Sequence, residues 1–442
     1  MRITTNTRVL AHPTTGVERY LLELLPRLQR HADVRQCSPS SSMSGVRAHV
    51  WEQMVLPRKL KGQLLWSPAN TGPLAVKNQV VTIHDVVPLE HPEWLNPRFA
   101  VWYRFLMPRL ARRVRKVITV SNYSRDRLVA LTGIPREKVA VIANGVNPLF
   151  FNISQEQISA ARNGLNLPPG RYVLSLGSVE PRKNLPRLIE AWNRIANRIP
   201  SDISLVIAGA RNARVFAAAE TGRRAMKNEQ RRGGGFTTTT RRHDATGDSQ
   251  RGSGGKRRKL GITSSERGGD DSSRRAGTQA SWQVDPAGPT ESAALPGNSG
   301  FQIPGAKSPA TADTPPRIYY LGRVADSLLP GLYAGALAFA YASLYEGFGL
   351  PPLEAMAAGV PVLTGDLTSL PEVIGDAGIM VNPLDVDALA NGLLQLIENQ
   401  ELRSRLSAVG VNQAKQFTWD KAAEETLAVL GAASQEECGI SI

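Results

Sequence analysis

The sequence has 442 residues, and 53 lysines and arginines against 38 aspartates and glutamates give it a formal charge of +15. That length indicates two or three domains, and a hydrophobic content of 42% excludes a chain that is disordered throughout. Two cysteines, Cys37 and Cys438, exclude a disulfide framework and a zinc site built from cysteines. The positive charge leaves three partner classes open: nucleic acid, an anionic membrane surface and phosphorylated substrates.

Four short apolar runs in the first third of the chain predict strands: QLLWSPA (63–69), QVVTIHD (79–85), KVITVS (116–121) and KVAVIAN (138–144). Helices are predicted between them, after Gly16 over VERYLLELLPRLQR and later over RFAVWYRFLMPRLARRV. Continuous apolar strands that alternate with helices are typical of a parallel sheet covered on both faces.

A second block repeats this alternation, with strands predicted at YVLSLG (172–177), ISLVIAG (203–209), RIYYLG (317–322), ALAFAYAS (336–343), VPVLTG (360–365) and GIMVNP (378–383). The fold class that we predict is therefore α/β, with two doubly wound, Rossmann-like domains over 1–165 and 166–430. Ligands of such sheets bind at the carboxyl ends of the strands, here in a cleft between the domains.

The second block is interrupted by a stretch rich in Gly, Ser, Thr, Pro and Arg that has no apolar periodicity. We interpret about 227–315 as a disordered, low-complexity basic insertion, because such a composition cannot bury enough surface to offset its ordering entropy. Residues 211–316 contain 18 basic and 10 acidic side chains, which is more than half of the excess charge. A functional insertion and an artefact of gene disruption both stay open.

The clearest chemical pattern is YASLYEGFGLPPLEAMAAGVPVL (341–363), in which a glycine turn precedes a helix that opens with Pro351-Pro352. Proline suits the first helical turn because its missing N–H would have no partner there. The free amides before the helix and its positive end predict an anion site, and a diphosphate is the natural guest. The residues that supply these amides are Gly347, Phe348, Gly349 and Leu350.

Two carboxylates flank this turn, Glu346 before it and Glu354 within the helix. Carboxylates form strong hydrogen bonds with neutral hydroxyls, so both residues suit a sugar or a ribose. There is an alternative in which Glu346 is a solvated loop residue and Glu354 merely complements the helix dipole. That alternative explains the two positions equally well.

The spacing Glu-x7-Glu in EGFGLPPLEAMAAGVPV resembles the retaining nucleotide-sugar glycosyltransferases of the GT-B fold, family 4. Six further matches follow in the family's order: VVTIHDVVPLEHPEWL (80–95), VITVSNYSRDRL (117–128), VAVIANGVNPLFF (139–151), LGSVEPRKNLPRLIEAW (176–192), IYYLGRV (318–324) and SLPEVIGDAGIMVNP (369–383). The resemblance implies the GT-B fold, with the helix of residues 418–442 returning to the first domain.

The resemblance also implies roles for the second domain. Glu346 would contact the donor sugar, and Glu354 would hold the ribose hydroxyls. Arg182 and Lys183 in EPRKN match the basic pair that neutralises a leaving diphosphate. The alternative is that the two residues are a solvated pair at the start of a helix. Positive charge at a helix N-terminus opposes the helix dipole, which favours the functional interpretation. Val324, in IYYLGRV, is a further donor-site candidate.

In the first domain, the resemblance places His84 beside the reacting sugar, and a histidine at a strand end capped by Asp85 is the alternative. Gly16 follows Pro13-Thr14-Thr15 and matches the family's glycine-bearing loop for the donor diphosphate or the acceptor. The family's loop usually has paired glycines, and here only Gly16 is present.

Two other patterns are weak. Asp385-x-Asp387 looks like a metal-binding DxD motif, but it begins an amphipathic helix and fits an N-cap. We therefore predict no metal. The cluster KRRK (256–259) could bind nucleic acid or acidic lipids by counterion release, but it has no aromatic platform for specific RNA recognition.

The resemblance implies a retaining hexosyltransferase, similar within the family to mannosyl- and rhamnosyltransferases of bacterial surface polysaccharide synthesis, and we expect it to be metal-independent. No cofactor is expected; the co-substrate would be a nucleoside diphosphate sugar, with GDP-mannose favoured, and the acceptor a saccharide or a polyprenyl-diphosphate-linked saccharide. An epimerase of the same fold and a non-catalytic binder of anionic polymers are the alternatives. Because the sequence has neither a signal peptide nor a long apolar run, we expect a cytoplasmic protein, with peripheral contact at the inner face of the cell membrane left open.

Overall fold

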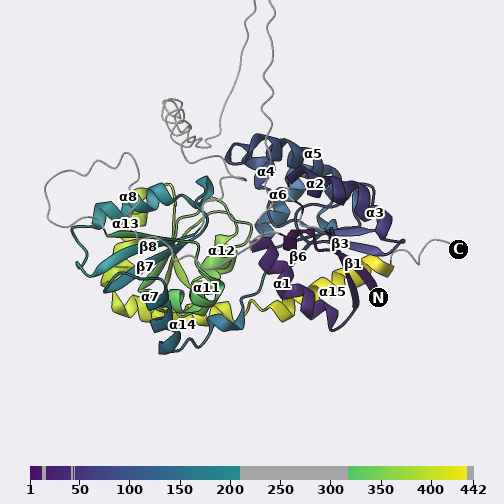
Figure 1. Ribbon diagram of the computed structural model, residues 1–442. Helices are drawn as coiled ribbons and strands as arrows, with labels where there is room; N and C mark the ends of the chain where they lie inside the picture. Colours follow the sequence, from purple (N-terminus) through teal and green to yellow (C-terminus); the bar gives the residue numbers. More distant parts are fainter. Residues whose placement is uncertain (12–15, 41–42, 44, 210–316, 436–442) are drawn as a thin grey trace, which may run out of the picture. The chain divides into compact units, whose positions relative to one another are not determined.

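The computed structural model describes residues 1–11, 16–40, 43, 45–209 and 317–435 (Figure 1). The insertion interpreted at about 227–315, its KRRK cluster and the Pro13–Thr15 loop lie outside these residues. Within the described part, no helix is both long and apolar enough to cross a bilayer.

The first half of the chain builds a six-stranded parallel sheet with the order β2-β1-β3-β4-β5-β6. Its strands are β1 Arg2–Asn6, β2 Asp33–Cys37, β3 Leu64–Ser67, β4 Gln79–Thr82, β5 Lys116–Thr119 and β6 Val139–Val141. Its α-helices are α1 Gly16–Gln29, α2 Gly45–Val50, α3 Leu56–Lys59, α4 Val87–Glu90, α5 Pro97–Arg113 and α6 Asn122–Thr132. A π-helical turn, η2 Trp51–Val55, joins α2 to α3.

The second half builds another six-stranded parallel sheet with the order β12-β11-β10-β7-β8-β9. Its strands are β7 Arg171–Leu176, β8 Ile203–Ala208, β9 Ile318–Gly322, β10 Ala338–Tyr341, β11 Val362–Gly365 and β12 Gly378–Val381. The helices are α7 Gln155–Gly164, α8 Leu185–Ile195, α10 Leu329–Ala334, α11 Leu350–Ala357, α12 Leu370–Ile374, α13 Val386–Glu398, α14 Gln400–Ala414 and α15 Trp419–Gln435.

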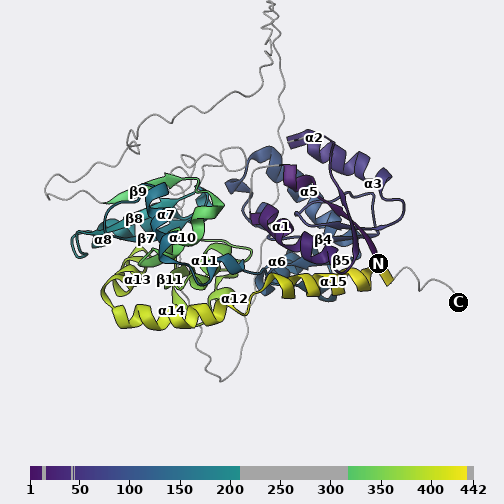
Figure 2. The same ribbon diagram turned by 60° about the horizontal axis from the view of Figure 1, so that its bottom comes forward.

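Helices cover both faces of each sheet, as the continuous apolar strands predict. On the first sheet, α1 and α15 share a core cluster on one face, while α5 and α6 pack on the other. On the second sheet, α8 and α13 pack on one face and α10 and α11 on the other (Figures 1 and 2). The predicted α/β class with two parallel sheets is confirmed.

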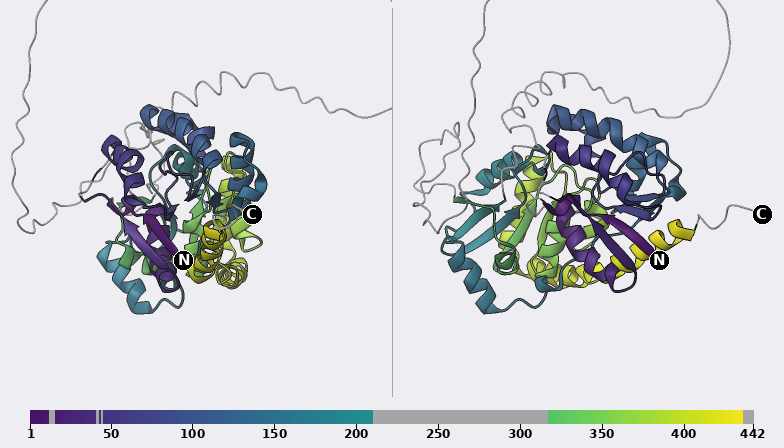
Figure 3. Two further views of the ribbon diagram at one scale, coloured as in Figure 1. Left: turned by 90° about the vertical axis from the view of Figure 1, so that its right-hand side faces the viewer. Right: turned by 45° about the vertical axis from the view of Figure 1, so that its right-hand side comes forward.

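The last helix crosses from the second half of the chain to the first sheet. Val146 and Thr418 form an isolated bridge just before α15 begins. From there α15, the yellow helix, runs beside the purple N-terminal elements (Figure 3). Its Trp419 and Leu430 enter the same core cluster as Tyr20 of α1. The domain boundaries at 1–165 and 166–430 stay a prediction.

The apolar-run criterion fails at the start of the chain. It predicts no strand before residue 63, yet β1 is the second strand of the first sheet. The residues of β1 are RITTN, and the sheet buries Thr4, Thr5 and Asn6 despite their polar side chains. The predicted strand 79–85 is also shorter than expected, because β4 ends at Thr82 and His84 lies in the connection that follows.

Candidate functional site

The strand order of the second sheet brings two distant connections together. β7 and β10 are neighbours, although β8 and β9 lie between them in the chain. In open parallel sheets, ligands bind at the carboxyl ends of the strands where the order reverses. The segment after β7 contains Arg182 and Lys183, and the segment after β10 contains Glu346. The topology thus assembles three of the predicted site residues.

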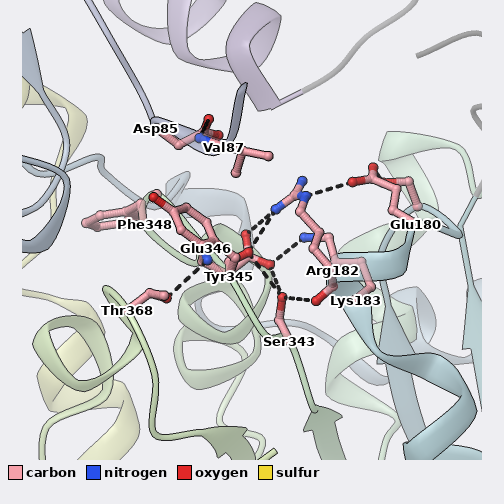
Figure 4. Close-up of polar contacts among 12 residues, drawn as sticks. Asp85, Val87, Glu180, Arg182, Lys183, Ser343, Tyr345, Glu346, Phe348 and Thr368 are labelled. Carbon is pink, nitrogen blue, oxygen red and sulfur yellow. Dashed lines mark hydrogen bonds and ion pairs between the residues drawn. The ribbon is translucent and has the colours of Figure 1, made fainter. Parts of the chain in front are cut away.

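Glu346 is buried at the centre of this assembly (Figure 4). Its Oε1 oxygen accepts hydrogen bonds from Lys183 Nζ at 2.7 Å and Ser343 Oγ at 2.5 Å. The hydroxyl of Tyr341 donates to the same oxygen at 2.9 Å. Its Oε2 oxygen accepts from Arg182 Nη1 at 2.9 Å. Both carboxylate oxygens are therefore held by basic side chains, an arrangement that we call the Glu346 clamp.

The two basic residues have further partners. Arg182 Nε donates to Glu180 Oε2 at 2.7 Å, and Lys183 Nζ donates to the Tyr341 hydroxyl at 2.5 Å. The two connections are also joined through backbone, because Leu344 N donates to the Arg182 carbonyl at 2.7 Å. The guanidinium and the ammonium group are therefore fixed in position by both connections.

The charges of the Glu346 clamp set its protonation. Burial alone would raise the pKa of Glu346, but Lys183 and Arg182 outweigh it and lower that pKa to about 2. Burial and the neighbouring Arg182 charge lower the pKa of Lys183. Burial opposes the charged form of Arg182 as well, but Glu346 and Glu180 raise its pKa. Glu346 is thus an anion at neutral pH, as a diphosphate would be.

The glycine turn after Glu346 packs against the first half of the chain. A Cβ atom added to Gly347 would lie 2.2 Å from the His84 carbonyl oxygen, so this position has no room for a side chain. Ser121 Oγ donates to the Gly347 carbonyl at 2.8 Å. Gly349 has a φ of 109°, in the region that favours glycine, and it precedes the first residue of α11.

Phe348 and Leu350 contribute backbone rather than side chains to this turn. The Phe348 ring is buried against Phe417, with ring centroids 5.7 Å apart. Leu350 begins α11 and packs against two core clusters. Their amides lie at the positive end of α11, where the sequence predicts an anion site.

Glu354 is also buried, and both of its oxygens are engaged. Arg19 Nη1 donates to Oε1 at 2.5 Å, and the Tyr333 hydroxyl donates to Oε2 at 2.9 Å. Arg19 Nη2 donates to Asp326 Oδ1 at 3.0 Å as well. Burial raises the pKa of Glu354, and Arg19 acts against that rise. A ribose that bound this carboxylate would therefore have to displace Arg19 or the Tyr333 hydroxyl from it.

His84 is buried and neutral. Burial lowers its pKa to about 4. Its Nε2 lies 2.8 Å from the carbonyl oxygen of Pro68, which can only accept, so Nε2 carries the proton and Nδ1 is an acceptor. The ring meets Tyr20 edge-on at 4.7 Å. The imidazole is therefore suited to accept a hydrogen bond from a hydroxyl.

Asp85 lies beside the Glu346 clamp, although its sequence position suggested only a cap (Figure 4). Its Oδ1 accepts from Val87 N at 3.2 Å. A Cβ atom added to Gly347 would lie 3.1 Å from Asp85 Cβ. Burial raises the pKa of Asp85, while Arg182 opposes the rise.

Two predicted donor residues, Gly16 and Val324, are not among the hydrogen-bond partners of Glu346. Gly16 is the first residue of α1, and a Cβ atom there would meet no described atom within 4 Å. Val324 is buried in the core cluster that also contains Tyr333 and Phe339. Its side chain therefore serves packing, and only its backbone is left for a ligand.

Sequence reasoning missed several residues of the site. Glu180 lies in the same EPRKN segment as the basic pair, and Tyr341 and Ser343 lie in the strand segment before Glu346, so motif inspection could have included them. No sequence signal connects Arg19 with Glu354, because 335 residues separate them.

The DxD-like pair has the structural role that we expected. Asp385 Oδ1 accepts from the backbone N–H groups of Asp387 and Ala388 at 2.9 Å and 3.0 Å, which makes Asp385 the N-cap of α13. In the part of the chain that the structure describes, no cluster of three or more His, Cys, Asp or Glu residues could hold a metal.

Comparison with solved structures identifies the fold. HepE of Anabaena, solved in complex with UDP and glucose, matches with a TM-score of 0.61 over 98% of this chain and 100% of that chain, at 16% identity. WaaG, a glycosyltransferase involved in lipopolysaccharide biosynthesis, matches with a TM-score of 0.60 over 97% and 99%, at 13% identity.

Family models match both halves of the sequence. The model described as Glycosyltransferase Family 4 covers residues 64–149, and that described as Glycosyl transferases group 1 covers residues 310–413. The chain is a GT-B glycosyltransferase. The O-antigen chain mannosyltransferase B of Escherichia coli is 25% identical to this glycosyltransferase over 465 residues, 97% of this chain and 98% of that protein. The serotype-specific mannosyltransferase WbdA of Escherichia coli is 24% identical over 77% of this chain, but the match spans 32% of WbdA.

Proposed function

We propose that the protein transfers a mannosyl group, with retention of anomeric configuration, from a nucleoside diphosphate sugar to a saccharide or lipid-linked saccharide. The Glu346 clamp at the ends of β7 and β10 carries the proposal, because it holds an internal anion with two cations. The mannosyl assignment is supported by relatives named as O-antigen mannosyltransferases, and GDP-mannose is the donor that we favour. A nucleotide donor is supported by HepE, which was solved with UDP and glucose.

Donor binding would exchange partners within the Glu346 clamp. A diphosphate carries more negative charge than one carboxylate, so it would compete for Arg182 and Lys183. Glu346 would then be released toward the hydroxyls of the sugar. The amides of Gly347–Leu350, at the start of α11, would bind the phosphate oxygens. Glu354 would accept hydrogen bonds from the ribose hydroxyls once its hydrogen bond from Arg19 is broken.

Transfer would break the bond from the anomeric carbon to the diphosphate oxygen and form a bond to the acceptor oxygen on the same face of the sugar. The acceptor proton would pass to the leaving diphosphate, so no protein nucleophile is required. Arg182 and Lys183 would stabilise the charge that develops on the leaving group, in place of a metal ion. Neutral His84 would accept a hydrogen bond from a sugar hydroxyl through Nδ1, and Asp85 would orient the acceptor.

The acceptor class connects the reaction to a membrane. A polyprenyl-diphosphate-linked saccharide would require the enzyme to work at the inner face of the cell membrane, as a peripheral protein. Nucleic acid has no part in the reaction that we propose.

Titration calorimetry with GDP and UDP, followed by turnover with GDP-mannose, tests the donor site. We expect one nucleotide to bind and Lys183→Ala to lower kcat by about 10²–10³-fold, as for loss of a group that stabilises developing charge. The exposed Lys421→Ala is the matched control. If neither nucleotide binds, the donor site is misassigned. NMR of the product anomer tests retention, and activity in EDTA tests metal independence.

The epimerase alternative gives a different result in the same assay. An epimerase would isomerise the nucleotide sugar without an acceptor. Detection of isomerised donor, and no glycosidic product in any acceptor mixture, would replace the transferase assignment.

A further inference from the structure

The connection between β3 and β4 holds His84 by its backbone and by its ring. The backbone N–H of His84 donates to Asn70 Oδ1 at 2.6 Å, and its ring Nε2 donates to the Pro68 carbonyl at 2.8 Å. Asn70 N in turn donates to the carbonyl of Thr82, two residues before His84, at 2.9 Å. The orientation of the imidazole therefore depends on where this connection lies.

Asn70 has a backbone conformation that few residue types adopt. Its φ of 60° lies in the left-handed region, where asparagine is favoured over most residues other than glycine. An asparagine in such a turn commonly hydrogen-bonds to its own neighbouring backbone. The carboxamide oxygen of Asn70 instead accepts from the amide of His84, 14 positions later. The side chain of Asn70 therefore holds His84 in addition to forming the turn.

The residue after Asn70 belongs to a buried polar network at the end of β1. Thr71 Oγ1 donates to Glu52 Oε1 at 2.9 Å and accepts from Arg8 Nη2 at 3.0 Å. Asn6 Nδ2 donates to the same Glu52 oxygen at 2.7 Å, and Arg8 Nε lies 3.4 Å from it. The side chain of Glu52 is fully buried. We call these four residues, Asn6, Arg8, Glu52 and Thr71, the Glu52 brace.

Two consecutive residues of the π-helical turn η2 contact the same connection. Glu52 binds Thr71, and Gln53 Nε2 donates to the Gly72 carbonyl at 2.8 Å. Gln53 Oε1 also accepts from Leu74 N at 3.0 Å. Turns of this type are rare and are frequent at functional sites. The turn thus fixes the residues that directly follow Asn70.

The Glu52 brace lies where the strand order of the first sheet reverses. β2 and β3 are on opposite sides of β1, so the reversal falls between β1 and β3. Asn6 is the last residue of β1, Arg8 follows it, and Thr71 lies in the connection after β3. Ligands of open parallel sheets bind at this point. The brace therefore has the same place in the first sheet as the Glu346 clamp has in the second.

Stability alone does not explain a charged network at this position. Burial by itself would raise the pKa of Glu52, but Arg8 and the hydrogen bonds on the carboxylate outweigh it and lower that pKa. Buried ion pairs generally stabilise a fold no more than apolar side chains of the same volume do. A polar network does fix geometry, because hydrogen bonds tolerate only a narrow range of distances and angles. The geometry that this network fixes is that of the connection that holds His84.

We propose that Asn70 is a positioning residue for His84, and that the Glu52 brace holds Asn70 in place. With the Pro68 carbonyl fixed, the imidazole keeps its proton on Nε2, and Nδ1 is available to accept from a sugar hydroxyl. This inference rests on the role proposed for His84 in sugar transfer. The hydrogen bonds of the imidazole, however, can be measured without turnover.

Nuclear magnetic resonance of the full chain with ring-¹⁵N histidine tests the positioning directly. In the wild type, the His84 Nε2–H proton should give a signal at neutral pH, because its hydrogen bond slows exchange with water; His84→Gln assigns that signal. Asn70→Gly tolerates the left-handed backbone but removes the carboxamide, and it should abolish the signal. The control Asn166→Gly makes the same change at an exposed asparagine with a φ of 47° and should leave the signal intact.

Kinetics with GDP-mannose separate positioning from nucleotide binding. Asn70→Gly should lower kcat by about 10–100-fold, as expected for a small misplacement of a group at the reacting sugar, while GDP affinity in calorimetry stays unchanged. Asn70→Asp retains an acceptor oxygen for the His84 amide and should keep kcat within about threefold of the wild type. Thr71→Val removes the hydroxyl from the Glu52 brace and should reduce both kcat and the Nε2–H signal by less than Asn70→Gly does.

The proposal fails if the ¹⁵N shifts of the wild type place the proton on Nδ1. It also fails if folded Asn70→Gly retains the Nε2–H signal or, in an active enzyme, the wild-type kcat, or if Asn70→Asp loses as much kcat as Asn70→Gly. If Asn70→Gly does not fold, Thr71→Val decides by the same two measurements. A chain that transfers no sugar, but loses the signal in Asn70→Gly, would overturn the proposed function and leave the positioning of His84 standing.

Discussion

Arg19 of α1 donates to Glu354 Oε1 at 2.5 Å, although the two side chains belong to helices that cover different sheets. With the Tyr333 hydroxyl on Oε2, the carboxylate has a protein partner on each oxygen. Asp326 shares the same guanidinium at 3.0 Å. The contact joins the two halves of the chain at the residue that we propose for the ribose, so that proposal would couple nucleotide binding to the contact between the halves.

Removing Arg19 should therefore strengthen nucleotide binding. In Arg19→Gln the ribose hydroxyls no longer displace a charge-assisted hydrogen bond, and we expect GDP or UDP to bind about three- to tenfold more tightly. Calorimetric titration measures the change, and Arg30→Gln, at an exposed arginine beyond the end of α1, is the control. Weaker binding in Arg19→Gln would instead mean that Arg19 itself contacts the nucleotide.

Glu346→Gln should destabilise the protein, because it leaves Lys183 and Arg182 without their shared carboxylate. Loss of one partner of a buried ion pair costs about 3–5 kcal/mol, measured by chemical denaturation. Added GDP should restore stability to the variant more than to the wild type, since a diphosphate replaces the lost anion. Glu190→Gln, at an exposed ion pair with Arg194, should change stability by less than about 0.5 kcal/mol. A variant as stable as the wild type would contradict the Glu346 clamp.

The same variant should change the acid stability of the protein. The folded pKa of Glu346 is about 2, below its ordinary 4.5, so the folded state binds fewer protons. Its stabilising contribution is therefore present above about pH 4.5 and is lost as the pH falls toward 2. Denaturation midpoints between pH 5 and 2 should fall less steeply for Glu346→Gln than for the wild type. Parallel curves would show that Glu346 does not titrate there.

His84 should titrate in a different window. Its folded pKa of about 4 lies below its ordinary 6.5, so the unfolded chain takes up a proton first as the pH falls. Folded stability should therefore decrease between pH 6.5 and 4, and His84→Gln should remove that component. The exposed His31→Gln is the control.

We also expect His84→Ala to lower kcat by about 10–100-fold while GDP affinity stays constant; a change in affinity alone would place His84 at the nucleotide.

The sequence could predict that three residues of the Glu346 clamp lie at one edge of the second sheet, but not that they pair with one another. Arg182, Lys183 and Glu346 follow the apolar runs 172–177 and 336–343, and parallel strands bring their carboxyl ends to one edge of the sheet. The helix after Pro351-Pro352 was also evident, because proline marks a first turn. Local patterns and sheet topology were sufficient for these features.

Other features were hidden for physical reasons. β1 buries the polar run TTN beside its neighbours, so its alternation of apolar and polar residues is absent. Arg19 occupies an ordinary helical position, and only the packing of α1 against α11 gives it a partner. The Glu-x7-Glu spacing indicates that both carboxylates lie near a ligand. It does not indicate which protein groups bind them, so the ion pairs of Glu346 with Arg182 and Lys183, and of Glu354 with Arg19, could not be predicted.

Two glycine substitutions separate folding from ligand access. Gly347→Ala should lower the melting temperature by several degrees and activity by at least about 100-fold, because its Cβ would meet the His84 carbonyl at 2.2 Å. Gly16→Ala has no described atom within 4 Å of the new Cβ, so its melting temperature should match the wild type. If the donor diphosphate approaches the backbone at Gly16, the methyl group should weaken GDP binding at least about fivefold. Unchanged GDP affinity in a normally folded Gly16→Ala would remove Gly16 from the donor site, whereas wild-type stability in Gly347→Ala would show that the turn can move away from His84.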